Sequence, residues 1–381
     1  MAEVQMQKLI KRFGDFVAVD DVNIDVEDGE FVFLLGPSGC GKTTTLRMLA
    51  GLEMPTEGQI SIGARNVTYL KPRYRNVGMV FQDYGLYRHM TVFGNIAYPL
   101  QVRRLRKDEI ARKVGEVAET MQISEVLTRK PDQLSGGQLQ RVAIARMLVR
   151  DADVFLMDEP MSHLDAQLRG HMRAELRHIQ KEIGVTTIFV THDQLEAMTM
   201  ADRIIVMKDG RMLQFATPRE IFERPRNEFV ATFVGEPQMN VFDVTLQKTD
   251  RGIAAIAGDI IVPLDSSWVE TNQLEQHVGD QLRLGIRPEH IKVAEKSDKS
   301  HTVPAELYAF EPTGAENLYV MHCGEFEVTT RTSTSETAHF RKDEGAPFSL
   351  CFDPQWIYLF NRSTGEAIAH ASLSLVQEGD F

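Results

Sequence analysis

GPSGCGKTT, residues 36–44, follows directly on the apolar run FVFLL at 31–35. It fits the pattern G-x-x-x-x-G-K-[ST] between a predicted strand and a predicted helix, which is the context that a phosphate-binding P-loop requires. Glycines let backbone N–H groups turn inward around phosphates, and the start of a helix adds partial positive charge. Lys42 supplies a full charge, and the Thr43 hydroxyl can bind Mg²⁺. The predicted ATP-binding residues are Gly36, Pro37, Ser38, Gly39, Cys40, Gly41, Lys42, Thr43 and Thr44.

Two carboxylates end a second apolar run, VFLMDE at 154–159. Hydrolysis of a bound nucleotide needs one group that organises Mg²⁺ and another that polarises the attacking water. We predict that Asp158 lies on the metal side and that Glu159 is the general base. Without a P-loop, an Asp-Glu pair after a strand is more often a solvated turn.

Short apolar runs alternate with helical patterns over the first 220 residues. Helices between strands are typical of crossovers in a parallel sheet, so the fold class is predicted to be α/β. Asp209-Gly210 predicts a tight hairpin, and Thr217-Pro218 predicts the start of a helix. The expected strands are 31–35, 77–81, 154–157, 187–191 and 204–207, and the expected helices are 42–50, 138–149 and 167–182.

A second anion-binding signal is LSGGQ at 134–138, followed by a helical pattern. Ser135 and Gln138 have the spacing of a capping box, which leaves helical N–H groups free to meet an anion. The P-loop already holds this chain's phosphates, so we predict that Ser135, Gly136, Gly137 and Gln138 close over a nucleotide held by a second subunit. The simpler interpretation is that Ser135 only caps the helix.

After about residue 235 the sequence changes to short alternating segments with turn residues, which favours small β-barrels. The segment 282–294 matches 348–360 in pattern, with Pro288 and Pro354 in equivalent places. This similarity indicates a duplicated β-unit, although alternating patterns also resemble one another by chance.

Charge and composition narrow the classes of function. Residues 241–381 hold 11 Lys and Arg against 22 Asp and Glu, whereas residues 1–240 are nearly neutral. An acidic surface repels phosphate backbones, so a nucleic-acid partner is not expected; solubility alone would also explain the acidity. No apolar run approaches the ~20 residues that cross a bilayer, and the expected compartment is the cytoplasm. Three cysteines form no disulfide framework, and Cys40 receives no redox role.

With these motifs in order, residues 1–235 resemble the ATPases of ABC transporters, with a helical subdomain at about 84–150. The resemblance implies that Gln82 lies near Mg²⁺ and water, and that His192 contacts the γ-phosphate. It also implies that Asp165 belongs to a loop crossing the dimer, and that Phe13 stacks on adenine. Phe13 could instead be a core residue.

Residues 236–381 resemble the paired OB-like regulatory extension of importer ATPases for maltose, related sugars and glycerol 3-phosphate, with GIRPEHI at 285–291 the most specific match. The resemblance implies a second ATPase subunit, identical or a sister chain, and two transmembrane permease subunits served by an extracytoplasmic solute-binding protein. It places the chain on the cytoplasmic face of the inner membrane. The sequence departs from the family's usual residues at Gly85, Arg88, Leu139 and His163.

Three alternatives remain open. The solute could be a polyamine or iron, or the C-terminal region could mainly bind a regulatory protein. The third alternative is a cytosolic ABC ATPase, which would be expected to carry two P-loops, whereas this chain has one.

The apolar and aromatic side chains that follow Gln82 have two interpretations. They either pack in the core or line a groove for a partner helix: Tyr84, Leu86, Tyr87, Met90, Phe93 and Tyr98.

Overall fold

The structure is a computed structural model that describes residues 2–250, 252–258, 260–294, 302–337, 340 and 343–371. The chain divides into two compact units, Met1–Pro218 and Arg219–Phe381. The boundary expected near residue 235 and the span of the helical subdomain stay predictions. Residues 372–381 of the expected C-terminal domain lie outside the described residues.

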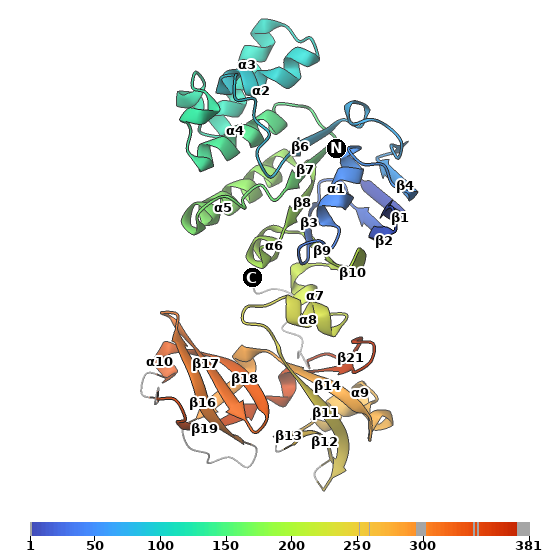
Figure 1. The fold of residues 1–381 in the computed structure, drawn as a ribbon, viewed down its shortest axis with the longest axis vertical. Coiled ribbons are helices and arrows are strands. Elements are labelled where there is room, and N and C mark those ends of the chain that lie inside the picture. Colours follow the sequence, from blue (N-terminus) through green and yellow to red (C-terminus); the bar gives the residue numbers. More distant parts are fainter. Residues whose placement is uncertain are drawn as a thin grey trace. The chain divides into compact units, whose positions relative to one another are not determined.

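A six-stranded sheet with the order β10-β9-β3-β8-β7-β6 forms the centre of the first unit (Figure 1). All neighbouring strands run parallel except β10, which returns antiparallel to β9 through a hairpin at Asp209-Gly210. Both turn residues have positive φ, as a two-residue hairpin requires. The strands are β3 (Phe31–Leu35), β6 (Val77–Val80), β7 (Val154–Asp158), β8 (Thr186–Thr191), β9 (Arg203–Lys208) and β10 (Arg211–Ala216).

Alternation along β3 gives this sheet two different apolar faces. Val32 and Leu34 join a core that includes α1 (Lys42–Ala50), whereas Phe31 and Phe33 pack with Phe189 of β8. A helix on each face explains why β3, β7 and β8 are buried along their whole length. The other helices are α2 (Val92–Val102), α3 (Lys107–Thr120), α4 (Gly136–Leu148), α5 (Ala166–Ile183) and α6 (Gln194–Met200).

An antiparallel sheet with the order β2-β1-β4-β5 covers the far side of α1. Sequence reasoning did not assign this sheet. Its long strands are interrupted by register shifts, so the alternation of buried and exposed residues breaks within each strand. The strands are β1 (Val4–Phe13), β2 (Phe16–Val26), β4 (Glu57–Ile62) and β5 (Arg65–Asn66).

The second unit begins at the second residue of α7 (Pro218–Glu223), continues through α8 (Glu228–Phe233) and then forms two antiparallel sheets. Their orders are β13-β12-β11-β14-β20-β21 and β15-β19-β16-β17-β18, and the end strands β15 and β18 of the second sheet lie against each other. The fold class is therefore confirmed. The strands are β11 (Asn240–Thr249), β12 (Gly252–Ala257), β13 (Ile260–Pro263), β14 (Gln281–Ile286), β15 (Ile291–Ala294), β16 (Val303–Pro312), β17 (Glu316–Cys323), β18 (Phe326–Ser333), β19 (Pro347–Phe352), β20 (Ile357–Asn361) and β21 (Ala367–Ala369), with short helices α9 (Ser266–Thr271) and α10 (Thr334–Thr337).

The two similar segments at 282–294 and 348–360 pair with each other. Each forms a strand, a short 3-10 turn and a second strand. The first strand of each segment pairs with the second strand of the other, as in the pairs Ile286–Ile357 and Ile291–Phe352. His290 and Trp356, at equivalent positions of the two turns, stack with ring centroids 3.8 Å apart. This mutual pairing supports the predicted duplication.

No helix in the described part of the chain is both long and apolar enough to cross a membrane.

Candidate functional site

The predicted catalytic residues meet at one edge of the parallel sheet. Strands β3, β8, β7 and β6 are neighbours, and their carboxyl ends lie at the same edge because they run in the same direction. The P-loop follows β3, and the other three strands end at or just before His192, Asp158 and Gln82. Ligands of open α/β sheets bind outside the carboxyl ends of the strands.

The backbone of the P-loop requires glycine at two positions. Gly41 has φ of 104°, and a Cβ there would lie 2.5 Å from the carbonyl oxygen of Ala18. A Cβ on Gly36 would lie 2.3 Å from the carbonyl oxygen of Met207. The loop therefore lies directly on its neighbours, while Ser38 and Gly39 are exposed to an incoming ligand. Such a loop, opening into α1, fits a phosphate group.

Lys42 is buried, and its ammonium turns back onto the loop. Nζ donates to the carbonyl oxygens of Gly36 at 2.7 Å and Pro37 at 3.0 Å, and it lies 3.8 Å from Cys40 Sγ. The ammonium charge is thus held within the P-loop. Burial raises the pKa of the Cys40 thiol, which keeps it protonated and unreactive.

Asp158 and Thr43, the two residues predicted to lie on the metal side, are hydrogen-bonded to each other. The Thr43 hydroxyl donates to Asp158 Oδ1 at 3.0 Å, which joins the start of α1 to the end of β7. Burial raises the pKa of the Asp158 carboxyl, and the Thr43 hydrogen bond partly offsets this. Among the described residues no group of three or more His, Cys, Asp and Glu side chains gathers to hold a metal. One carboxylate and one hydroxyl fit Mg²⁺, which is bound by few protein ligands together with phosphate oxygens.

Glu159 is held by two neighbours. Its Oε2 lies 3.3 Å from Gln82 Nε2 and 3.3 Å from His192 Nδ1. The backbone of Glu159 has φ of 46°, a left-handed conformation that few non-glycine residues adopt and that is common at functional sites. The structure therefore brings together the three residues predicted to be catalytic: Glu159, His192 and Gln82.

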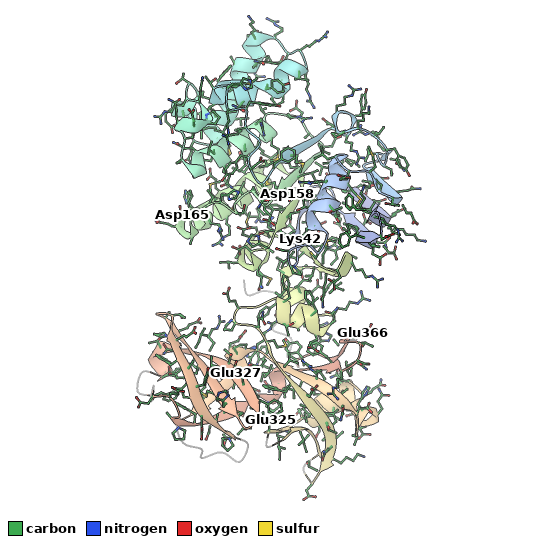
Figure 2. The ribbon with its side chains drawn as sticks, in the orientation of Figure 1. Lys42, Asp158, Asp165, Glu325, Glu327 and Glu366 are labelled. Atoms are coloured by element: carbon green, nitrogen blue, oxygen red, sulfur yellow. The ribbon has the colours of Figure 1, made fainter. Side chains whose placement is uncertain are left out.

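The LSGGQ residues and Asp165 lie apart from the P-loop. Ser135 caps α4: its Oγ accepts from Gln138 N, and Gln138 Oε1 accepts from Ser135 N at 3.0 Å, so the predicted capping box is present. Asp165 caps α5 by accepting from Leu168 N at 2.9 Å. Within the described residues, neither Ser135 nor Gln138 bonds to the loop at 36–44. Figure 2 shows Lys42 and Asp158 in the middle of the first unit and Asp165 at the end of α5.

Phe13 ends β1 with its side chain 47 % exposed, so it is not a core residue. The ammonium of Lys11 lies 4.7 Å from the centre of its ring and is itself anchored to Glu53 and to the Met54 carbonyl oxygen. One face of the ring is covered by a cation, and the exposed remainder is free for an aromatic ligand.

Sequence reasoning did not single out Arg169 or Glu196, which contact the two residues on either side of His192 in the chain. Arg169 Nη1 pairs with Asp193 Oδ2 at 3.0 Å, and the Thr191 hydroxyl donates to Glu196 Oε2 at 2.6 Å. Burial raises the pKa of the Glu196 carboxyl. Arg169 is one of three arginines spaced four residues apart on α5, with Arg173 and Arg177, so the sequence does not distinguish it as the one that makes such a contact.

Three protein families match the chain. The ABC transporter family matches residues 19–162, the MalK OB fold domain matches 235–291, and the TOBE domain matches 284–360. Together with the P-loop and the carboxylates at the strand ends, these matches define an ABC-type ATPase with a MalK-type C-terminal region.

Curated relatives are similar over nearly the full chain. The xylose/arabinose import ATP-binding protein XacJ of Haloferax volcanii is 44 % identical, over 100 % of this chain and 99 % of its own length. The trehalose/maltose import ATP-binding protein MalK of Thermococcus litoralis is 45 % identical, and the sn-glycerol-3-phosphate import ATP-binding protein UgpC of Ruegeria pomeroyi is 43 % identical, each over 97 % of this chain and 100 % of its own length. The chain belongs to this family of ABC transporter ATP-binding subunits.

A solved structure covers the ATPase part. The ATP-binding cassette MJ0796, in a dimeric post-hydrolysis state bound to ADP and Pi, aligns with a TM-score of 0.52 at 32 % identity over 57 % of this chain and 99 % of that chain. The ATP-binding fold predicted from the P-loop is therefore confirmed.

Proposed function

We propose that this chain hydrolyses ATP to energise uptake of a carbohydrate or polyol-type solute across the cytoplasmic membrane, on whose cytoplasmic face it works. The relatives named above import xylose or arabinose, trehalose or maltose, and sn-glycerol 3-phosphate. The observation that carries the catalytic part is the meeting of Glu159, Gln82 and His192 beside the P-loop.

Each side chain has a separate role in hydrolysis. Phe13 stacks on adenine, and the loop at 36–44 holds the phosphates. Thr43, Asp158 and Gln82 would hold Mg²⁺, which when bound offsets the phosphate charge. Glu159 accepts the proton of the attacking water, and His192 orients Glu159 and reaches the γ-phosphate.

A second subunit completes the site. Ser135, Gly136 and Asp165 are exposed at helix starts, away from their own P-loop. We infer that Ser135, Gly136, Gly137 and Gln138 bind the phosphates of a nucleotide held by the partner, identical or a sister chain, and that Asp165 crosses the interface. Support comes from the similar cassette MJ0796, which is described as a dimer.

A groove of about 440 Å³ gives a place for a permease subunit. Tyr87 and Tyr98 line it together with Gly85 and Arg146, whose Nη1 donates to the Gly85 carbonyl oxygen. Tyr84 is buried and does not belong to this surface. An aromatic groove beside Gln82 suits an amphipathic helix of a permease, and two permease subunits would serve two ATPase chains.

Two further partners complete the proposed importer. An extracytoplasmic solute-binding protein would deliver the solute, and the acidic C-terminal region would receive a regulatory protein.

Replacement of the general base tests the catalytic assignment. The variant Glu159→Gln should bind ATP as the wild type does and lose about a hundredfold or more in turnover, because an amide cannot accept the proton. Glu182→Gln on exposed α5 surface is the matched control and should keep full activity. Hydrolysis by Glu159→Gln at the wild-type rate would remove Glu159 from this role.

The solute is identified with the complex reconstituted in vesicles. Pentoses, maltodextrins and glycerol 3-phosphate should be compared with a polyamine and with chelated iron for their stimulation of ATP hydrolysis. Stimulation only by the polyamine or iron would overturn the carbohydrate assignment.

The groove is tested by a pair of tyrosine variants in the same complex. Tyr87→Ala should uncouple ATP hydrolysis from the permease. Tyr69 is exposed but does not line the groove, so Tyr69→Ala should leave the coupling unchanged.

A further inference from the structure

We propose that Arg169 is a positioning residue that connects the loop of Asp165 to the loop of His192. Through this connection, contact between the Asp165 loop and the partner subunit changes the position of the loop that carries His192. The inference rests on the proposed function, because it gives Asp165 the dimer interface and His192 the γ-phosphate. It adds a residue to which the motifs assign no part in hydrolysis.

Arg169 contacts both loops at once. It lies one helical turn after Asp165, and its backbone N donates to the Asp165 carbonyl oxygen at 2.9 Å. Its guanidinium donates through Nη2 to the carbonyl oxygen of Leu164 at 3.1 Å and through Nη1 to Asp193 Oδ2 at 3.0 Å. Leu164 directly precedes Asp165, and Asp193 directly follows His192. A single planar group therefore spans the backbone beside one functional residue and the side chain beside the other.

The Asp193 end of this contact is fixed in turn. Asp193 Oδ1 accepts from Glu196 N at 3.1 Å as the cap of α6, and Asp193 N donates to the Thr191 hydroxyl at 2.9 Å. That hydroxyl donates to the buried Glu196 carboxylate, which lies 4.0 Å from Arg169 Nε. The residues on both sides of His192 are thus held, while the His192 side chain itself is 58 % exposed.

The strength of the contact follows from its charge and burial. The side chains of Arg169 and Asp193 are 27 % and 20 % exposed, so solvent screens the pair less than a surface pair. A guanidinium has fixed donor geometry and forms charge-assisted hydrogen bonds, whereas an ammonium is a point charge. A shift of the Asp165 loop would therefore move Asp193, and with it the backbone on which His192 is mounted.

Two variants remove the contact from opposite ends. Arg169→Ala deletes the donor, and Asp193→Asn deletes the anionic acceptor while keeping an amide oxygen able to cap α6. In the purified full chain with MgATP, each should lower kcat by about tenfold or more with KM for ATP changed by less than about twofold. The double variant should be no worse than either single variant, because both remove the same interaction. Arg169→Lys should recover part of the loss.

Arg177 provides the matched control. It lies on the same helix and pairs with Asp202 at side-chain exposures of 24 % and 38 %. Arg177→Ala should keep kcat within about twofold of the wild type. Equal losses in Arg169→Ala and Arg177→Ala, or additive losses in the Arg169 and Asp193 variants, would overturn the proposal.

Amide hydrogen exchange tests the contact without relying on activity. The amides of residues 193–197 should exchange faster in Arg169→Ala than in Arg177→Ala, with and without a non-hydrolysable ATP analogue. Unchanged exchange there would overturn the role of Arg169 whatever the ATPase result. Absence of MgATP hydrolysis in the wild-type chain would instead overturn the proposed function, so the two failures are distinguishable.

Discussion

At the scale of single residues, Glu159 depends on the backbone that holds it. The sequence predicts a carboxylate pair after an apolar strand, and the chemistry of hydrolysis assigns the two roles. The left-handed φ of Glu159 and its contacts with Gln82 and His192 could not be predicted from the residues, because they depend on the order of β6, β7 and β8 in the sheet. Phe13 was predicted from the family resemblance, whereas the cation over its ring was not.

Phe13 gives a prediction that separates binding from catalysis. Phe13→Ala should raise KM for ATP about tenfold with little change in kcat, since stacking of a base on an aromatic ring contributes about 1–3 kcal/mol. Phe16→Ala is the control, because Phe16 faces Phe13 across the hairpin and is also exposed. Steady-state kinetics of the purified chain measure both variants. A larger KM effect from Phe16→Ala would assign the adenine contact to the other strand.

At the scale of secondary-structure elements, length and burial decide which elements the sequence predicts. The expected strand 31–35 and helix 42–50 coincide with β3 and α1, and the other parallel strands agree to within a residue or two at their ends. These strands are apolar on both faces, so a short continuous run identifies them. The sheet of β1, β2, β4 and β5 was missed because it is half-exposed and its register shifts break the alternating pattern.

The P-loop gives a prediction at this scale. Gly39→Ala meets no atom within 4 Å and should destabilise the chain by about 1 kcal/mol, through its positive φ alone. Gly41→Ala adds a close contact with the Ala18 carbonyl oxygen and should cost about 2 kcal/mol more. Chemical denaturation followed by far-UV circular dichroism compares the two. Equal stability of the variants would show that the loop can move away from β2.

At the scale of the whole molecule, Arg287 is a buried cation that joins separate elements of the second unit. Arg287 is 1 % exposed, and its Nη1 and Nη2 donate to the carbonyl oxygens of Val234 at 2.8 Å and Phe222 at 2.7 Å. The guanidinium also lies 3.6 Å from the centre of the Phe222 ring. Arg287 therefore joins α7 and the end of α8 to the turn that begins at Pro288 in the first of the two similar segments.

Loss of the Arg287 guanidinium should lower the stability of the second unit. Arg287→Met should lower the stability of residues 219–381 by about 3 kcal/mol, because the buried carbonyl group of Val234 and the partly buried one of Phe222 lose their donors. The chain has two tryptophans, Trp268 and Trp356, and both lie in this unit, so their fluorescence reports its unfolding. Arg362→Met, which removes a half-exposed pair with Asp243, should cost less than about 1 kcal/mol. Equal midpoints for the two variants would contradict the anchoring role of Arg287.

In the second unit, each of the two similar segments pairs its strands with those of the other, β14 with β20 and β15 with β19, which makes their folding interdependent. Each repeat supplies strand partners for the other, so a chain that held one repeat would have to find those partners in a second molecule. Joining the copies in one polypeptide converts a concentration-dependent encounter into an intramolecular one. During synthesis, the first repeat must wait until the ribosome has made the second before either can close.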